Sequence, residues 1–255
     1  MNIMEKVYKE IIDYILESGK RIVKKSGNIK DIGVAKKDLT EEDLRIERDL
    51  ENIIKKHNPN HELFAEEEHD SSPNAEDIWV ADPISGTSLF IHGEPHYALV
   101  IAHMKNNVVQ FAVAYDPSAD ELFTAYKGKG AFLNGKPIEV SKRYDVNKIK
   151  VIFAPSSGWK DEGKVKEITE ALIKYSAYKI RCSFALRYCY VACGRYDGII
   201  ALTKDVFPEV AGGFIIREAG GIFKNDKGEN ILKYNDRIFV GGNKKTYEIL
   251  KSVIV

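Results

Sequence analysis

The chain has no excess of charge of either sign. Its 255 residues include 38 lysines and arginines and 38 aspartates and glutamates, so the formal net charge is zero. A protein that binds nucleic acid polymers or membrane surfaces through general electrostatics needs a basic excess. The balance therefore argues against both classes and favours a small-molecule partner.

Long hydrophobic runs and cysteine are also scarce. No apolar run approaches the ~20 residues of a membrane span, and residues 1–24 are charged throughout, unlike a secretory signal. The three cysteines, Cys182, Cys189 and Cys193, lack nearby histidines and the spacing of a zinc site. We therefore expect buried, reduced thiols in a cytoplasmic protein without a membrane anchor.

The hydrophobic share of 44% predicts a sizeable core. Three-four periodicity predicts amphipathic helices over residues 4–25 and 40–56, and the second has the capping residues and acidic first turn of a helix start. Short strands separated by turn signals predict an antiparallel meander over residues 97–140.

Residues 150–252 differ from this pattern because strand and helix alternate along them. Alternation of this kind is typical of a layered α/β arrangement. Together with a polar stretch at residues 142–148, it predicts two lobes, residues 1–145 and residues 146–255.

The most informative stretch is residues 79–88, Trp-Val-Ala-Asp-Pro-Ile-Ser-Gly-Thr-Ser. Its apolar start predicts a buried strand that ends near Asp82, because Pro83 cannot donate a ladder hydrogen bond. Gly86 permits a tight bend. A carboxylate beside backbone carbonyls suits Mg²⁺, and glutamates at positions 66–68 add further carboxylates. Alternatively, Asp82 begins an ordinary turn and the glutamates form a solvated loop.

Five segments set the wider comparison: residues 38–43, 65–67, 79–87, 127–135 and 211–221. Their order and spacing resemble those of the inositol monophosphatase superfamily, over nearly the whole chain. The resemblance implies a two-lobed α-β-α-β-α sandwich with the active site between the lobes. It also implies Mg²⁺-dependent hydrolysis of a small phosphorylated sugar, inositol or nucleotide, and a homodimer.

The resemblance further implies a set of residues for the metal and the attacking water. Glu66 and Asp82 would bind the first Mg²⁺ together with the backbone carbonyl of Ile84. Asp43 and Thr87 would orient the water, with support from Glu66. Such clustered carboxylates fit phosphoryl transfer, which needs cations near the phosphate oxygens and an in-line water. Asp43 is equally well explained as a helix-start acid.

The substrate side is implied in the same way. The amides of Gly86, Thr87 and Ser88 would bind the phosphate oxygens, and Ser183 would line the pocket for the rest of the substrate. The simpler alternatives are turn residues at positions 87 and 88 and a helix cap at position 183.

Two departures from the family pattern concern the second metal. The family loop is Asp-Pro-Ile/Leu-Asp-Gly-Thr, and its second aspartate is Ser85 here. A further family aspartate, at the start of the helix before Glu-Ala-Gly-Gly, is replaced by Pro208. Neither residue offers a carboxylate. Asp205, in the preceding loop, and Glu209, one position along the helix, are the candidates for compensation.

These departures leave two hypotheses. The first is a Mg²⁺-dependent phosphomonoesterase with one well-formed metal site and an impaired second site. The second is a catalytically inactive member of the superfamily that acts as a binding or regulatory protein.

Overall fold

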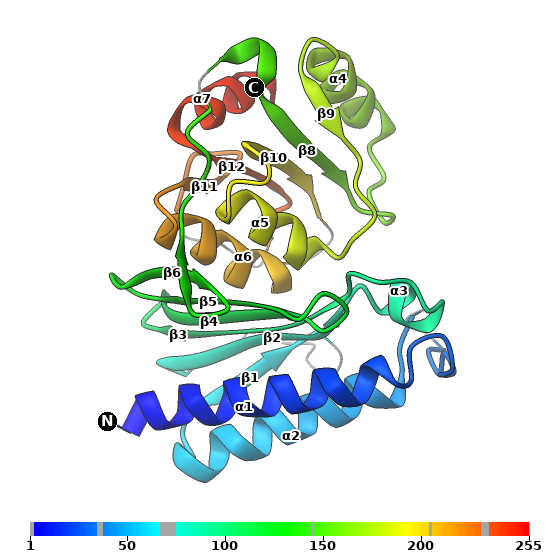
Figure 1. The fold of residues 1–255 in the computed structure, drawn as a ribbon, viewed down its shortest axis with the longest axis vertical. Helices are drawn as coiled ribbons and strands as arrows, with labels where there is room; N and C mark the ends of the chain where they lie inside the picture. The colour runs from blue at the N-terminus through cyan, green and yellow to red at the C-terminus, as the bar shows by residue number, and fades with distance from the viewer. Residues whose placement is uncertain are drawn as a thin grey trace.

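The computed structural model describes residues 3–34, 38–66, 75–143, 145–203, 206–230 and 235–254. Five layers are stacked in it (Figure 1). Helices α1 (Ile3–Val23) and α2 (Glu41–His57) form the first layer, below a seven-stranded sheet. Helices α5 (Phe184–Ala192) and α6 (Phe207–Glu218) separate it from a five-stranded sheet, which α4 (Glu162–Leu172) and α7 (Lys244–Ile254) cover. This confirms the predicted α-β-α-β-α sandwich.

The seven-stranded sheet follows chain order from β1 to β7. Only β1 and β2 pair in parallel, and each later strand is antiparallel to the one before it, so the predicted meander is confirmed. Its strands are β1 (Glu62–Ala65), β2 (Asp77–Ser85), β3 (Ala98–Lys105), β4 (Val108–Asp116), β5 (Glu121–Tyr126), β6 (Gly130–Leu133) and β7 (Lys136–Ile138).

Strand β2 corrects one prediction. It does not end near Asp82 but continues through Pro83 to Ser85. The pairing with β3 shifts register between Asp82 and Ser85, and proline is tolerated at such an irregularity because no regular ladder bond is needed there. A short helix that we did not predict, α3 (Thr87–Ile91), follows directly.

The second half has strand order β11-β12-β10-β8-β9. Its strands are β8 (Lys150–Pro155), β9 (Ser176–Tyr178), β10 (Gly198–Leu202), β11 (Ile222–Asn225) and β12 (Ile238–Gly242), and a single 3-10 turn, η1 (Val146–Lys148), precedes them. Strand β11 was not predicted, because the Gly-Gly pair before it indicated only the end of a helix. It pairs antiparallel with β12.

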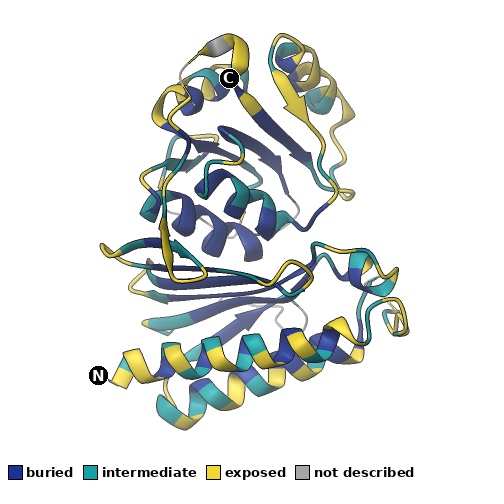
Figure 2. Ribbon diagram, viewed as in Figure 1, coloured by how far each residue is buried: buried dark blue, intermediate teal, exposed yellow. Residues whose placement is uncertain are grey.

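Three hydrophobic cores hold the layers together. One lies between α1, α2 and the first sheet, and one lies under α4 and α7. The largest joins the other face of the first sheet to α5, α6 and the second sheet. Helix α6 is buried along nearly its whole length, in contrast to the outer helices, whose exposed faces are yellow in Figure 2. Burial on all sides is expected for a mostly apolar helix in such a central layer.

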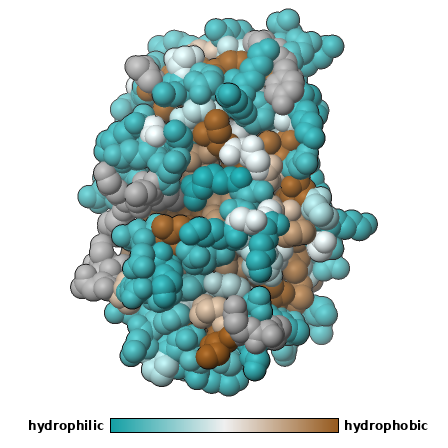
Figure 3. All heavy atoms as spheres, turned by 90° about the vertical axis from the view of Figure 1, so that its left-hand side faces the viewer, coloured by the Kyte–Doolittle hydropathy of each residue, from teal (hydrophilic) through white to brown (hydrophobic). Residues whose placement is uncertain are grey.

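The face that carries the N-terminal end of α1 is mostly hydrophilic, with small, separated hydrophobic patches (Figure 3). Within the described ranges, no helix combines the length and the apolar character that crossing a membrane requires. All three cysteines are free, and Cys182 and Cys189 are buried as expected.

Candidate active site

Glu66 and Asp82 follow paired positions of two parallel strands, Glu66 just after the end of β1 and Asp82 within β2. The register pairs Ala65 with Ala81, so the next residues, Glu66 and Asp82, follow on neighbouring strands, which lie roughly 4.8 Å apart. Side chains alternate along a strand, and Phe64 belongs to the core on the α6 side of the sheet. Glu66 and Asp82 therefore continue the face that looks toward α6. Asp82 is only 4% exposed.

Asp43 is held at the first turn of α2. Its Oδ2 accepts hydrogen bonds from the backbone N–H of Thr40, at 2.9 Å, and from the Thr40 hydroxyl. Thr40 is the N-cap, and its side chain accepts from the N–H of Glu42, so the predicted capping box is confirmed. Asp43 thus does act as an acidic residue at the helix start, as the simpler alternative predicted. This role uses only Oδ2 and leaves the other carboxylate oxygen, Oδ1, for a further contact.

That second oxygen faces Thr87. The Thr87 hydroxyl lies 3.3 Å from Asp43 Oδ1 and 2.8 Å from the carbonyl oxygen of Ile84. A hydroxyl has one proton, so it can donate to only one of these two acceptors at a time. The contact joins the start of α2 to the loop at the end of β2, two segments that are far apart in the sequence.

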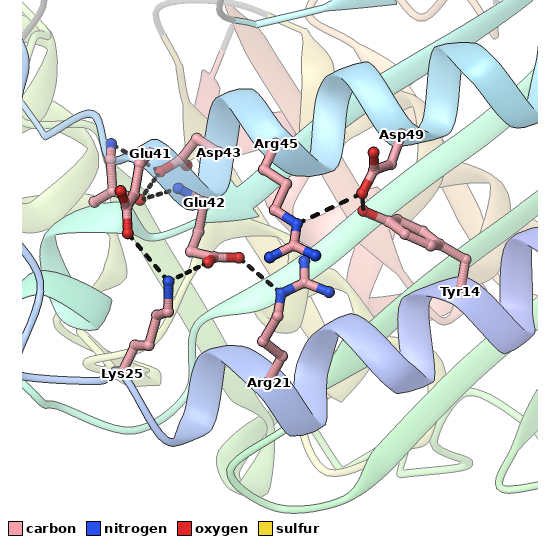
Figure 4. Close-up of polar contacts among 9 residues, drawn as sticks. Tyr14, Arg21, Lys25, Glu41, Glu42, Asp43, Arg45 and Asp49 are labelled. Carbon is pink, nitrogen blue, oxygen red and sulfur yellow. Dashed lines mark hydrogen bonds and ion pairs between the residues drawn. The ribbon is translucent and has the colours of Figure 1, made fainter.

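A buried ion-pair network lies beside Asp43 (Figure 4). The Glu42 carboxylate, 1% exposed, accepts from Arg21 Nε of α1 at 2.9 Å and from Lys25 Nζ, in the turn after α1, at 2.6 Å. Burial alone raises the pKa of Glu42, but the hydrogen bonds from Lys25 and Arg21 outweigh it, so the pKa lies below its ordinary value. The network fixes the first turn of α2 against α1.

Gly86 and Ser183 meet at the boundary between the lobes. A Cβ atom on Gly86 would stand 3.0 Å from the Cβ of Ser183, and Gly86 has a φ of +86°, which favours glycine. Ser183 is the N-cap of α5, as its simpler alternative predicted, and its N–H donates to the carbonyl of His96 at 2.9 Å. Its neighbour Cys182 is no nucleophile, because burial raises the pKa of the thiol to about 11.

Gly86 is also the N-cap of α3, so Thr87 and Ser88 are the first two residues of that helix. The first amide groups of a helix have no partner within the helix. These amides belong to the same segment as Gly86, which approaches Ser183, and Thr87, whose hydroxyl contacts Asp43. At one end of the first sheet the structure thus joins Asp43 to Thr87 and Gly86 to Ser183. Glu66 and Asp82 follow on adjacent strands.

The two departures from the family pattern lie at this same end of the first sheet. Ser85 is buried at the end of β2, and Pro208 is buried in the first turn of α6. Phe207 packs against Phe64, with ring centroids 5.0 Å apart, so the start of α6 lies beside the end of β1. Of the compensation candidates, Asp205 lies outside the described residues. Glu209 is buried and accepts a hydrogen bond from the Tyr188 hydroxyl of α5 at 2.9 Å.

Some contacts made by the family segments have no signal in the sequence. The glycine-rich turn at residues 127–130, which only superficially resembles a phosphate loop, is occupied by a side chain. The N–H groups of Gly128 and Gly130 donate to the Glu218 carboxylate at 3.0 and 3.1 Å. The two family segments are therefore joined to each other. Glu42 and its partners were also missed, since an acidic first turn does not reveal which helix supplies the cations.

The layered fold, with two carboxylates that follow on neighbouring strands, defines the class of structure, and sequence comparison identifies the family. The sequence profile described as the inositol monophosphatase family matches residues 3–254. The chain belongs to this family. It is similar to inositol monophosphatase 1 of Solanum lycopersicum, with 35% identity over 78% of this chain and 76% of that protein.

Other relatives carry different names. Nus factor SuhB of Pseudomonas aeruginosa is 31% identical, over 100% of this chain and 95% of its own. Among solved structures, the extragenic suppressor protein suhB of Bartonella henselae superimposes with a TM-score of 0.87 at 25% identity, over 99% of this chain and 98% of its own.

Proposed function

We propose that the protein is a phosphate monoester hydrolase that acts on a small phosphorylated sugar, inositol or nucleotide. The observation that supports this most directly is the Thr87 hydroxyl, which lies within reach of both Asp43 and the Ile84 carbonyl beside the buried Asp82. Orientation of an attacking water requires a polar pair held in this manner. Membership of a phosphatase family supports the same reading.

In this proposal the chain's own groups have separate tasks. Thr87 donates a hydrogen bond to Asp43, which leaves a lone pair on the hydroxyl oxygen to accept a hydrogen bond from the attacking water and so orient it. Asp43 is itself held by Thr40, so the pair is preorganised. The amides of Gly86, Thr87 and Ser88 bind the phosphate oxygens, and Ser183 contacts the rest of the substrate.

The donor set fits one Mg²⁺. Glu66, Asp82 and the carbonyl of Ile84 offer only oxygen atoms, which this ion prefers. When bound, the ion would neutralise phosphate oxygens and acidify a coordinated water. The donors for a second ion fit poorly, because Ser85 and Pro208 supply no carboxylate and Glu209 is engaged with Tyr188.

That poor fit supports a second candidate function, a non-catalytic binding or regulatory protein. Two neutral residues stand at the second metal site, and some relatives are named Nus factors rather than phosphatases. We propose it only as the alternative if hydrolysis is absent.

Phosphate release from inositol, sugar and nucleotide monophosphates, measured across Mg²⁺ concentrations, tests the first proposal. We expect turnover in the wild type, reduction to background in Asp82→Asn, and a loss of roughly 10²–10⁴-fold in kcat in Thr87→Val, the usual contribution of a general acid–base group. Thr87→Ser, which keeps the hydroxyl, is the matched control and should retain most of the activity.

The same assay can decide for the alternative. An inactive wild type that gains turnover when Ser85→Asp and Pro208→Asp are combined would reject the enzyme proposal and support a degenerate site. Glu209→Gln tests compensation: if Glu209 serves the second ion, this variant should raise the Mg²⁺ concentration needed for half-maximal rate.

A further inference from the structure

Two histidines and an aspartate lie together at the end of the first sheet opposite the candidate active site. His61 directly precedes β1, Asp77 begins β2, and His103 is on β3, so three neighbouring strands supply them. One ring nitrogen of each histidine and a carboxylate oxygen of Asp77 all lie within 4.8 Å of one another. His103 Nε2 is 3.0 Å from Asp77 Oδ1, and His61 Nε2 is 3.8 Å from Asp77 Oδ2.

This cluster is separate from the carboxylates of the candidate active site. Asp77 begins β2 and Asp82 lies five residues further along it, which corresponds to roughly 16–17 Å along a strand. Figure 1 shows α3, which follows β2, at the end of the sheet opposite the N-terminus of the chain. An ion at one end would not share ligands with an ion at the other.

The cluster opens into a cavity of about 920 Å³ between α1 and the sheet. All three residues line it, together with Tyr8 and Lys105. The histidines and the aspartate are largely buried, with 2–15% of each side chain exposed. A ligand could therefore reach the cluster, and a water molecule bound there would have space on the cavity side.

The hydrogen bonds define the ring tautomers. Trp79 Nε1–H donates to Nδ1 of His61 at 3.2 Å, which puts the His61 proton on Nε2, facing Asp77. The Tyr8 hydroxyl lies 2.7 Å from Nδ1 of His103, which places the proton of that ring on Nε2 in the same way when Tyr8 donates. Two N–H groups thus converge on one carboxylate, in positions that a cation would take over.

We propose that His61, Asp77 and His103 form a binding site for Zn²⁺, distinct from the Mg²⁺ site. Two imidazole nitrogens and one carboxylate oxygen, with a fourth position open to water, is a ligand set typical of Zn²⁺ and unsuited to Mg²⁺. The binding shifts each ring proton from Nε2 to Nδ1. On His103 the new Nδ1–H then donates a hydrogen bond to the Tyr8 oxygen. Such an outer hydrogen bond orients a metal-bound histidine.

Two groups oppose the ion and determine what binding must change. The Lys105 ammonium is 3.4 Å from Asp77 Oδ2, but the side chain is 52% exposed and can turn into water. His61 must turn its new Nδ1–H away from the Trp79 N–H. The Trp79 ring also stacks on His103, with centroids 4.6 Å apart, so its fluorescence should report binding.

The experiment uses the full chain with Trp159→Phe, which leaves Trp79 as the only tryptophan. After removal of bound metals, Zn²⁺ and Co²⁺ are titrated and the Trp79 emission is recorded. We expect saturation at one ion per chain, a shift of the emission with Zn²⁺ and quenching with Co²⁺. His61→Asn and His103→Asn should each weaken the affinity for Zn²⁺ and for Co²⁺ by about tenfold or more.

Three controls make the result decisive. His57→Asn removes a nearby histidine that pairs with Glu10 and is not one of the three proposed ligands. Asp82→Asn impairs the proposed Mg²⁺ site, so neither variant should alter the titration. Mg²⁺ should leave the emission unchanged. The proposal is overturned if Zn²⁺ leaves the Trp79 emission unaffected, or if the emission still responds to Zn²⁺ in His61→Asn. If His103→Asn fails to fold, the His61→Asn variant is sufficient for this test. The assay does not measure hydrolysis, so its outcome is independent of the proposed function.

Discussion

Glu42 shows how a single buried charge supports the candidate site without belonging to it. Its carboxylate joins Arg21 of α1 and Lys25 of the following turn to the first turn of α2 (Figure 4). The next residue is Asp43, whose two oxygens face Thr40 and Thr87. The position of Asp43 therefore depends on a contact between two helices as well as on the local capping box.

We predict that Glu42→Gln lowers the free energy of unfolding by about 1.5–3 kcal/mol at neutral pH, the contribution of hydrogen bonds to charged groups. Because the folded-state pKa of Glu42 is lowered, its stabilisation is present above the unfolded pKa of about 4.3 and is lost as the pH falls through the folded value. The difference between wild type and variant should therefore shrink below about pH 4.3. Denaturant titrations at pH 7, 5, 4 and 3 measure it.

Glu41→Gln is the matched control for this prediction. Glu41 also pairs with Lys25, at 3.1 Å, but its side chain is 69% exposed, so its removal should change stability by less than about 1 kcal/mol. Equal losses in the two variants, or a difference that does not depend on pH, would contradict the assigned role of Glu42.

At the scale of elements, helix α6 has the tightest surroundings. Its Gly212 and Gly213 face aromatic rings on two sides: a Cβ on Gly212 would stand 2.4 Å from Tyr188 of α5, and one on Gly213 would stand 2.2 Å from Phe223 of β11. The absence of side chains at these two positions allows α5 and the second sheet to approach the helix. The same approach places Tyr188 beside Glu209.

We expect Gly212→Ala to destabilise the protein by about 1–3 kcal/mol, because the methyl group overpacks the contact with Tyr188. This loss would exceed the gain of up to about 1 kcal/mol that alanine brings to a helix. Gly163→Ala, in the exposed α4, is the control: its Cβ would meet only Asp161 Oδ1, at 3.3 Å, so the propensity gain should dominate. Thermal unfolding should show a lower midpoint for Gly212→Ala and a higher one for Gly163→Ala. A stabilised Gly212→Ala variant would refute the packing argument.

At the scale of the whole molecule, the largest core joins the two proposed lobes. It contains Phe64, Val80 and Phe123 of the first sheet together with Ile199 and Phe239 of the second. The backbone bond from Val140 to Ala219 adds a polar link. Residues 1–145 and 146–255 therefore share one interior, although their strand patterns differ.

We predict that both lobes unfold in a single cooperative transition. In the Trp159→Phe variant, the Trp79 fluorescence of the first lobe should follow the same curve as the far-ultraviolet circular dichroism of the whole chain. Phe239→Leu, in the second sheet, should lower the midpoint seen by Trp79, with a stability loss of about 1.5 kcal/mol or less. Two separate transitions, or a Trp79 curve that Phe239→Leu does not move, would show independent lobes.

The sequence by itself determined what depends on near neighbours along the chain. The capping box at Thr40 and Asp43, the meander of residues 97–140 and the segment order typical of the family all follow from local hydrogen bonding, turn chemistry and spacing. The continuation of β2 past Pro83 could not be foreseen, because it requires the irregular pairing with β3.

Only the tertiary structure decided which distant residues meet. It placed Ser183 against Gly86, the Glu218 carboxylate on the turn at residues 127–130, and His103 beside His61 and Asp77. No spacing in the sequence encodes these contacts, because they arise from the stacking of layers and the order of strands in the sheets. The residues of the candidate site were proposed from sequence segments, whereas the contacts between distant residues depend on how the five layers pack.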